Sequence, residues 1–207
     1  MVRNLILDMG GVILEVDYRQ IFKSFTEFGC NDMQSFFTQQ TQIPLVDDFE
    51  KGLITPAQFR KEIRNIIKKD LSDKDIDTIW NSMVLKVRKD DVELLKILKS
   101  KYERLYLFSN TNEIHLEYVK EMFYKALGYD VFSSLFDKVY FSNEIKRRKP
   151  DSESFEYVIN NANVNKEETM FIDDTEQNIL GAEKVGLKTY LLNNHQTLCE
   201  IYNKGII

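Results

Sequence analysis

The chain has 207 residues, 43% of them hydrophobic and 29% charged, a balance that is ordinary for a globular protein with a substantial buried core. Its formal net charge of -5 gives no general electrostatic attraction to nucleic acid or to an anionic membrane surface, so we expect neither as a partner. Its two cysteines, Cys30 and Cys199, lie far apart in the sequence, which argues against a disulfide framework or a thiolate metal site.

The apolar runs are short throughout the chain. No stretch approaches the roughly 20 apolar residues that a membrane-spanning helix needs. The first run, residues 5–7, is followed at once by Asp8 and lacks the length and the small-residue cleavage site of a signal peptide. We therefore expect a cytoplasmic protein, and the sequence leaves its state open between a monomer and a homodimer.

Five short runs have the composition of buried β-strands: "LILD", "RLYLFS", "KVYFS", "TMFIDD" and "LKTYLL". Between the later runs lie segments with apolar residues at every third or fourth position, as in residues 90–102, 151–162 and 176–186. Alternating strands and helices are typical of a parallel sheet that is covered by helices on both faces. The pattern predicts an α/β fold with a Rossmann-like, doubly wound parallel sheet.

Residues 15–86 have a different pattern, which is helical almost throughout. Thr55 and Pro56 suit the N-cap and the first position of a helix, and similar helical segments occur in "DYRQIFKSFTEFG", "DMQSFFTQQ" and "SDKDIDTIWNSM". We predict a small helical cap domain, residues 15–86, inserted into an α/β core of residues 1–14 and 87–207. An insert at this place can cover the crevice at the carboxyl ends of the strands, where open α/β sheets bind ligands.

Polar residues stand at the ends of predicted strands or in the loops that follow them: Asp8, Ser109, Lys149, and the pair Asp173 and Asp174. In a parallel sheet these ends meet at one crevice. Carboxylates crowded there are costly unless a proton or a cation intervenes, and Mg²⁺ prefers oxygen ligands. A hydroxyl, a lysine and a cation around one carboxylate suit a phosphoryl group that the carboxylate attacks.

In this order, the motifs resemble those of the haloacid dehalogenase superfamily of hydrolases across nearly the whole chain. The resemblance implies that Asp8 is the catalytic nucleophile and forms an aspartyl-phosphate. It implies that Ser109 and its neighbour Asn110 bind the substrate phosphoryl group. Lys149 matches the lysine that stabilises both the nucleophile and the phosphate, so it would be catalytic and substrate-binding.

The same resemblance implies Mg²⁺ as the cofactor. The ion would be held by Asp8, the backbone carbonyl of Gly10 and Asp174, with Asp173 in support. We expect both Gly10 and Gly11 to allow the turn and the close approach of the backbone to metal and phosphate, because glycine lacks a Cβ and tolerates positive φ.

The segments "DMGGVI", "EKGLITPAQF", "SNTNEIH" and "RKPD" resemble the branch of this superfamily with a small helical cap. That branch includes a bacterial α-D-glucose-1-phosphate phosphatase and the N-terminal domain of soluble epoxide hydrolases. The resemblance implies a phosphatase acting on a small phosphorylated metabolite, such as a sugar phosphate, with specificity residing in the cap.

One position departs from the usual phosphatase motif. The residue two places after the nucleophile is Gly10, where the family pattern has a second aspartate that serves as general acid and then as general base. Such acid–base help is typically worth about 10² to 10⁴ in rate. Its loss should matter most for substrates with alkoxide-like leaving groups, and Glu15 and Asp17 are close enough in sequence to be considered as replacements.

Two other functions stay open on the sequence. A metal-independent 2-haloacid dehalogenase, with Asp8 attacking carbon, also lacks the second aspartate, although the intact pair Asp173 and Asp174 favours a metal enzyme. A non-catalytic, phosphate-binding regulatory protein of the same fold is the other alternative. Activity that survives EDTA would indicate the first, and binding without phosphate release the second.

For some residues, an ordinary structural role and a functional role are both open. Arg148 is expected at a solvated surface, although it lies close enough in sequence to help hold phosphate. His115 and His195 are expected as ordinary helix or surface residues, with a substrate contact open for His115. The aromatic residues of residues 15–86 are expected mainly in the core of the cap; they are Phe22, Phe25, Phe28, Phe36, Phe37 and Trp80.

Overall fold

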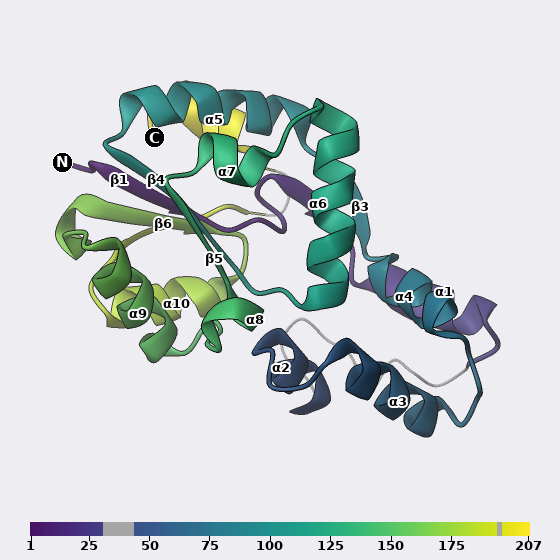
Figure 1. Cartoon of the computed structure of the whole chain (residues 1–207). Coiled ribbons are helices and arrows are strands. Elements are labelled where there is room, and N and C mark those ends of the chain that lie inside the picture. Colours follow the sequence, from purple (N-terminus) through teal and green to yellow (C-terminus); the bar gives the residue numbers. More distant parts are fainter. Residues whose placement is uncertain (31–43, 194–195) are drawn as a thin grey trace.

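The computed structural model describes residues 1–30, 44–193 and 196–207. At its centre is a five-stranded, fully parallel sheet in which the strand that precedes Asp8 occupies the middle position (Figure 1). The order across the sheet is β5 (Lys138–Phe141), β4 (Arg104–Ser109), β1 (Asn4–Leu7), β6 (Thr169–Asp173), β7 (Lys188–Leu191). The predicted strands and their parallel arrangement are confirmed.

Both faces of the sheet are buried, as parallel sheets require. In the central strand, Leu5 and Leu7 belong to one hydrophobic cluster and Ile6 belongs to the other. The first cluster is completed by α5 (Lys89–Lys101), α6 (Glu113–Leu127), α7 (Val131–Leu135) and α11 (Leu198–Asn203). The second is completed by α9 (Ser152–Ala162) and α10 (Glu176–Lys184) on the opposite face (Figure 1). The doubly wound α/β prediction is confirmed.

In the described residues of the insert there are four helices, which stand apart from the sheet next to the carboxyl ends of its strands (Figure 1). They are α1 (Arg19–Glu27), α2 (Pro44–Glu50), α3 (Pro56–Ile67) and α4 (Asp73–Asn81). The predicted start of α3 is confirmed, since the Thr55 hydroxyl accepts the backbone N–H of Gln58 and the Gln58 side chain accepts that of Thr55. The helix predicted from "DMQSFFTQQ", with Phe36 and Phe37, and His195 lie outside the described residues.

The two ends of the insert are strands, which the helical prediction for residues 15–86 did not include. β2 (Leu14–Val16) pairs antiparallel with β3 (Val84–Val87), with a register shift between Glu15 and Val16. Strands this short carry too little alternation to be recognised by periodicity, and they are stabilised by pairing with each other across the ends of the insert. The proposed boundaries of the cap fall inside this ribbon and stay a prediction.

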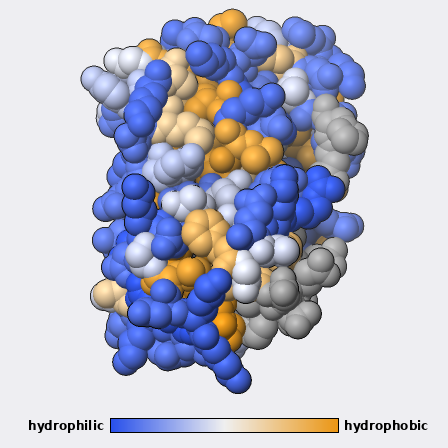
Figure 2. All heavy atoms as spheres, turned by 90° about the vertical axis from the view of Figure 1, so that its right-hand side faces the viewer, coloured by the Kyte–Doolittle hydropathy of each residue, from blue (hydrophilic) through white to orange (hydrophobic). Residues whose placement is uncertain are grey.

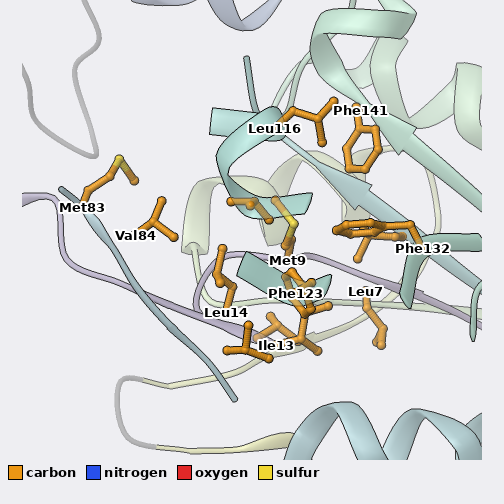
Figure 3. Packing of buried hydrophobic residues seen from close by; sticks show 14 of the residues in the cluster. Leu7, Met9, Ile13, Leu14, Met83, Val84, Leu116, Phe123, Phe132 and Phe141 are labelled. Carbon is orange, nitrogen blue, oxygen red and sulfur yellow. The ribbon is translucent and has the colours of Figure 1, made fainter. Parts of the chain in front are cut away.

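Apolar residues of the ribbon pack against the turn that follows β1. Figure 3 shows Met83 and Val84 beside Leu14, with Met9 and Ile13 close by in the same hydrophobic cluster. The side of the molecule that carries β3, α6 and α4 has a mainly hydrophilic surface with apolar side chains in separate groups (Figure 2). None of the helices in the described part of the chain combines the length and apolar character that crossing a bilayer demands.

Candidate active site

A cavity of about 380 Å³ lies at the carboxyl ends of β1 and β4, between the sheet and the insert. The residues that the sequence singled out converge on it. Those that line it directly are Asp8, Gly10, Ser109, Asn110, Lys149 and Asp174. Asp173 is fully buried behind this lining and reaches the site through Lys149.

Lys149 joins two acids from neighbouring strands. Its ammonium nitrogen lies 2.8 Å from Oδ1 of Asp8 and donates to Oδ2 of Asp173 at 2.6 Å. The lysine side chain is 1% exposed, so this cation is almost completely removed from water. Burial by itself lowers the pKa of Lys149, but the charges of Asp173 and Asp8 outweigh it and leave the pKa raised. Lys149 is therefore charged and fixed beside Asp8.

Three carboxylates are crowded in this place. Asp8, Asp173 and Asp174 each offer an oxygen within 4.8 Å of the others. Burial and the neighbouring acids raise the pKa of Asp8 to about 7, with Lys149 acting in the opposite direction. Burial and the charge of Asp173 raise the pKa of Asp174 to about 6. When all three carboxyl groups are ionised, their negative charge exceeds the single positive charge of Lys149.

This donor set fits a divalent cation. Hard cations such as Mg²⁺ take carboxylate and carbonyl oxygens, and a second positive charge would stabilise the ionised forms of Asp8 and Asp174. Asp173 is already committed: its Oδ1 accepts the backbone N–H of Thr175 at 2.8 Å, and its oxygens accept the Asn178 amide at 3.0 and 3.1 Å. Asp8 and Asp174 face the cavity and are better placed than Asp173 to bind an ion directly.

The two glycines that follow Asp8 and Met9 differ in what they require. Gly11 has φ of +70°, and a Cβ there would lie 2.0 Å from Oδ2 of Asp174, so both its backbone and its surroundings demand glycine. Gly10 has no positive φ, and a Cβ there would meet only Val16 methyl groups at 3.7 Å. The expectation of positive φ is confirmed for Gly11 and is wrong for Gly10, where a side chain has room.

Ser109 and Asn110 occupy the end of β4 and the loop after it. The Ser109 side chain is buried and borders the cavity. The Asn110 amide holds the backbone of Lys149 on both sides: its Nδ2 donates to the Lys149 carbonyl and its Oδ1 accepts the Lys149 N–H, both at 2.9 Å. Sequence reasoning missed this role, since no local pattern links Asn110 to a residue 39 positions later.

The insert supplies an acidic wall to the cavity. Asp47, Asp48 and Glu50 of α2 line it, together with Tyr18 from the residues before α1. Arg148 crosses from the core and donates to Oδ1 of Asp47 at 3.1 Å and to Oε2 of Glu50 at 2.9 Å. Arg148 was expected at a solvated surface, but its side chain is only 16% exposed and ties the core loop to α2.

His115 lies in the cavity lining, although it was expected as an ordinary helix residue. It is buried, and its ring stacks on that of Trp80 with 5.1 Å between centroids and 5° between planes. Burial lowers its pKa to about 4, so the ring is neutral near pH 7. Apolar residues also line the cavity, and three of them, Leu14, Met83 and Val84, are visible together in Figure 3.

The chain is similar to known proteins both in its sequence and in its structure. A family model described as haloacid dehalogenase-like hydrolase matches residues 2–186. The D-ribitol-5-phosphate phosphatase of Bacteroides thetaiotaomicron is 25% identical over 194 residues, which cover 94% of this chain and 93% of the relative. The sesquiterpene phosphatase AstK of Aspergillus oryzae is 26% identical over 196 residues, which cover 94% of this chain and 91% of the relative.

Two solved structures of a haloacid dehalogenase family enzyme from Bacteroides thetaiotaomicron are also similar. A variant in complex with magnesium and inorganic phosphate has a TM-score of 0.92 and 34% identity, with 98% of this chain and 99% of that chain covered. The wild-type enzyme in complex with the same two ligands has a TM-score of 0.86 and 35% identity, with 98% and 100% covered.

Proposed function

The chain belongs to the haloacid dehalogenase-like hydrolase family, and we propose that it is a Mg²⁺-dependent phosphatase of a small phosphorylated metabolite. The observation that carries the proposal is the buried Lys149 beside Asp8 at the tip of the central strand, with Asp174 nearby. The two relatives described above, which are named as phosphatases, support the same reaction. The magnesium and phosphate in the similar structures support the cofactor.

We propose that Asp8 is the nucleophile. One of its oxygens attacks phosphorus, the bond from phosphorus to the leaving-group oxygen breaks, and an aspartyl-phosphate results. Lys149 holds Asp8 in place and offsets the charge on the phosphoryl oxygens, and Ser109 binds one of those oxygens by its hydroxyl. Water then attacks the phosphorus of the aspartyl-phosphate, which releases inorganic phosphate and restores the Asp8 carboxylate.

Asp8, Asp174 and the carbonyl of Gly10 would hold the Mg²⁺, with Asp173 in support. The ion, when bound, supplies positive charge against the phosphoryl oxygens and keeps Asp8 ionised. Asp173 acts through Lys149, since its carboxylate fixes the ammonium group toward Asp8. Asn110 also positions Lys149, because its side chain holds the Lys149 backbone. Its own backbone remains available to bind the phosphoryl group.

Because Gly10 stands where the family pattern has an aspartate, this position supplies no general acid to the leaving group. The leaving-group oxygen must then take its proton from water or from the substrate itself. We therefore expect faster turnover with acidic leaving groups than with simple alcohols. Neither Glu15, which pairs with Lys86 at 3.2 Å, nor Asp17, whose carboxylate accepts Arg19 at 2.8 Å, is among the residues that line the cavity.

The acidic wall bears on the class of substrate. On the side of the cavity formed by α2, three carboxylates are met by two cations: Arg148, which bonds to Asp47 and Glu50, and Lys51, which bonds to Asp47 at 2.8 Å from outside the lining. One negative charge is left in excess. A leaving group with hydroxyls finds acceptors here, whereas a second phosphate or a carboxylate meets net negative charge. We propose an uncharged, hydroxyl-rich monophosphate, such as a sugar or polyol phosphate, as the substrate.

A phosphate-release screen tests the proposal. The panel contains sugar, polyol and prenyl monophosphates and p-nitrophenyl phosphate, each with Mg²⁺ and with EDTA, and the Asp8→Asn variant is the blank. We expect Mg²⁺-dependent release by the wild type and none by the variant. Halide release from 2-haloacids in EDTA would instead support the dehalogenase, and Mg²⁺-dependent vanadate binding without any turnover would support the regulatory alternative.

A further inference from the structure

The loop at the end of β4, residues 109–112, bonds to a different part of the molecule at each of its last three positions. Asn110 holds the backbone of Lys149. Thr111 bonds through its backbone to Ser142 of α8 (Ser142–Ile145). Asn112 bonds to Trp80 of α4. A loop that borders the cavity with Ser109 is thereby connected both to the catalytic lysine and to the insert.

The contact with α4 is a closed set of hydrogen bonds. Oδ1 of Asn112 accepts the indole N–H of Trp80 at 3.3 Å and the backbone N–H of His115 at 3.0 Å. Nδ2 of Asn112 donates to Nδ1 of His115 at 3.0 Å, and Nε2–H of His115 donates to the Trp80 carbonyl at 2.9 Å. Because an amide nitrogen only donates and a carbonyl only accepts, His115 must be the neutral Nε2–H tautomer.

The contact with α2 passes through one hydroxyl. Oγ of Ser142 accepts the backbone N–H of Thr111 at 2.9 Å and lies 2.6 Å from the Glu50 carbonyl, to which it donates. Its other carbonyl contact, to Thr111, is longer at 3.0 Å. Glu50 is the last residue of α2, the helix that carries the acidic wall. The loop is thus one hydrogen-bond step away from the wall.

Both contacts are shielded from water. Asn112 and Ser142 are 0% exposed, and Trp80 is 4% exposed. A buried polar group that loses its hydrogen-bond partner costs free energy, because no water replaces that partner. Breaking either contact when the loop moves is therefore unfavourable. A displacement of the loop therefore carries α2 and α4 with it, or breaks bonds that water does not replace.

We propose that Asn112 and Ser142 are positioning residues that couple oxyanion binding at residues 109–112 to the placement of the insert over the cavity. The proposal rests on the proposed function, because it takes this loop as the phosphate-binding loop. Binding of the oxyanion fixes the loop, and the two contacts pass that order to α4 and α2. Oxyanion binding then stabilises the arrangement in which the leaving-group wall faces the bound phosphoryl group.

The chain carries its own reporter of this contact, since Trp80 is the single tryptophan of the sequence. The probe is orthovanadate with Mg²⁺, an oxyanion without a leaving group. Its affinity is measured by titration calorimetry, and the placement of α4 is measured by Trp80 emission and by acrylamide quenching. In the wild type we expect quenching to fall on vanadate addition, with the midpoint that calorimetry gives.

The test variants are Asn112→Ser, which keeps a side chain that can cap the helix at the His115 backbone N–H but loses the bonds to the Trp80 indole and the His115 ring, and Ser142→Ala. The controls are Asn165→Ser, at the cap of a short helix remote from the insert, and Ser154→Ala, whose buried hydroxyl donates to the Asp151 carbonyl at 2.7 Å. If one test variant fails to fold by circular dichroism, the other carries the test alone.

In both test variants we expect weaker vanadate binding, by about fivefold or more as in typical coupled sites, and quenching of Trp80 that vanadate no longer changes. Both controls should behave as the wild type. Wild-type affinity and a wild-type quenching response in the test variants would overturn the coupling, as would vanadate binding to the wild type without any change at Trp80. Absence of vanadate binding to the wild type would instead overturn the proposed function.

Discussion

The ammonium nitrogen of Lys149 lies 2.8 Å from a carboxylate oxygen of Asp8, and both side chains are buried at the tip of the central strand. This pair joins the loop between α8 and α9 to the loop after β1, although the two residues are 141 positions apart in the sequence. Because Asp173 holds the same lysine from the other side, Asp8 has one defined orientation toward the cavity.

Replacement of Asp8, the proposed nucleophile, should abolish turnover while the fold persists. Asp8→Asn keeps the size of the side chain, but a neutral amide does not attack phosphorus. We expect phosphate release to fall by at least about 10³-fold, as when the nucleophile of other covalent catalysts is removed. Asp90→Asn, an exposed change outside the cavity, is the control. Equal turnover of Asp8→Asn and the wild type would refute the nucleophilic role.

Removal of the buried lysine should destabilise the fold as well as the reaction. Lys149→Met leaves Asp8 and Asp173 without their cation, and breaking a buried pair of this kind costs about 3–5 kcal/mol. Urea unfolding in EDTA measures the loss, and added Mg²⁺ should restore part of it by replacing the missing positive charge. Lys184→Met, an exposed lysine on α10, is the matched control. Equal free energies of unfolding for the two variants would contradict the prediction.

The two neighbouring glycines should respond in opposite ways. Gly10→Asp has room for its Cβ and returns a carboxyl group to the position of the absent general acid. We expect kcat/KM, which reports formation of the aspartyl-phosphate, to rise by about tenfold or more for alkyl phosphates, and little for p-nitrophenyl phosphate, whose leaving group needs no proton. Gly11→Ala should lose activity, because its Cβ would collide with Asp174. Slower turnover of alkyl phosphates by Gly10→Asp would argue against the assignment.

Neutralising the acidic wall should relax the charge preference. In Asp48→Asn the α2 side of the cavity loses one of three carboxylates, so repulsion of a second anion falls. We expect kcat/KM for a sugar bisphosphate to rise relative to that for the matching monophosphate, by about tenfold if the lost repulsion is ~1.4 kcal/mol. Glu117→Gln, an exposed acid on α6, should leave the ratio unchanged. An unchanged ratio in Asp48→Asn would exclude the wall as a charge filter.

His115 should make the fold sensitive to mild acid. Burial lowers its pKa to about 4, against 6.5 for the unfolded chain, so below pH 6.5 the unfolded state binds a proton that the folded state does not. Stability should fall as the pH drops from about 6.5 to 4, by roughly 3 kcal/mol in total at about 1.4 kcal/mol per pKa unit.

The matched variant for this effect is His115→Gln, which keeps a hydrogen-bonding side chain but does not titrate in this range. Asp8 and Asp174, with raised pKa values, act in the opposite direction in both proteins, so the difference between the two stability curves isolates the histidine. Parallel curves between pH 7 and 4, measured by urea unfolding, would show that His115 does not contribute.

Much of the architecture could be predicted because it is written in local patterns. Each strand of the parallel sheet is a short apolar run, and the residues at the strand ends, Asp8, Ser109 and Asp173 among them, converge for the reason that parallel strands end at one edge. The loop residue Lys149 was predicted from its motif, and the structure places it between two of those acids.

The rest depends on contacts that no local pattern encodes. The bonds of Asn110 to Lys149, of Asn112 to Trp80 and of Arg148 to α2 join residues 32 to 101 positions apart, and each uses a polar residue that looks like an ordinary turn or surface residue. The β2–β3 ribbon was missed for a similar reason, since each of its strands is stabilised by a partner at the other end of the insert.

That ribbon has a consequence for how such a protein diversifies. Because β2 and β3 run side by side, the polypeptide leaves the core and returns to it at adjacent points. The segment between them can change in length or sequence without altering the register of the central sheet, provided that the contacts of α2 and α4 with the core are kept or replaced. Evolution and protein engineering can then change the substrate by replacing one contiguous segment of the chain.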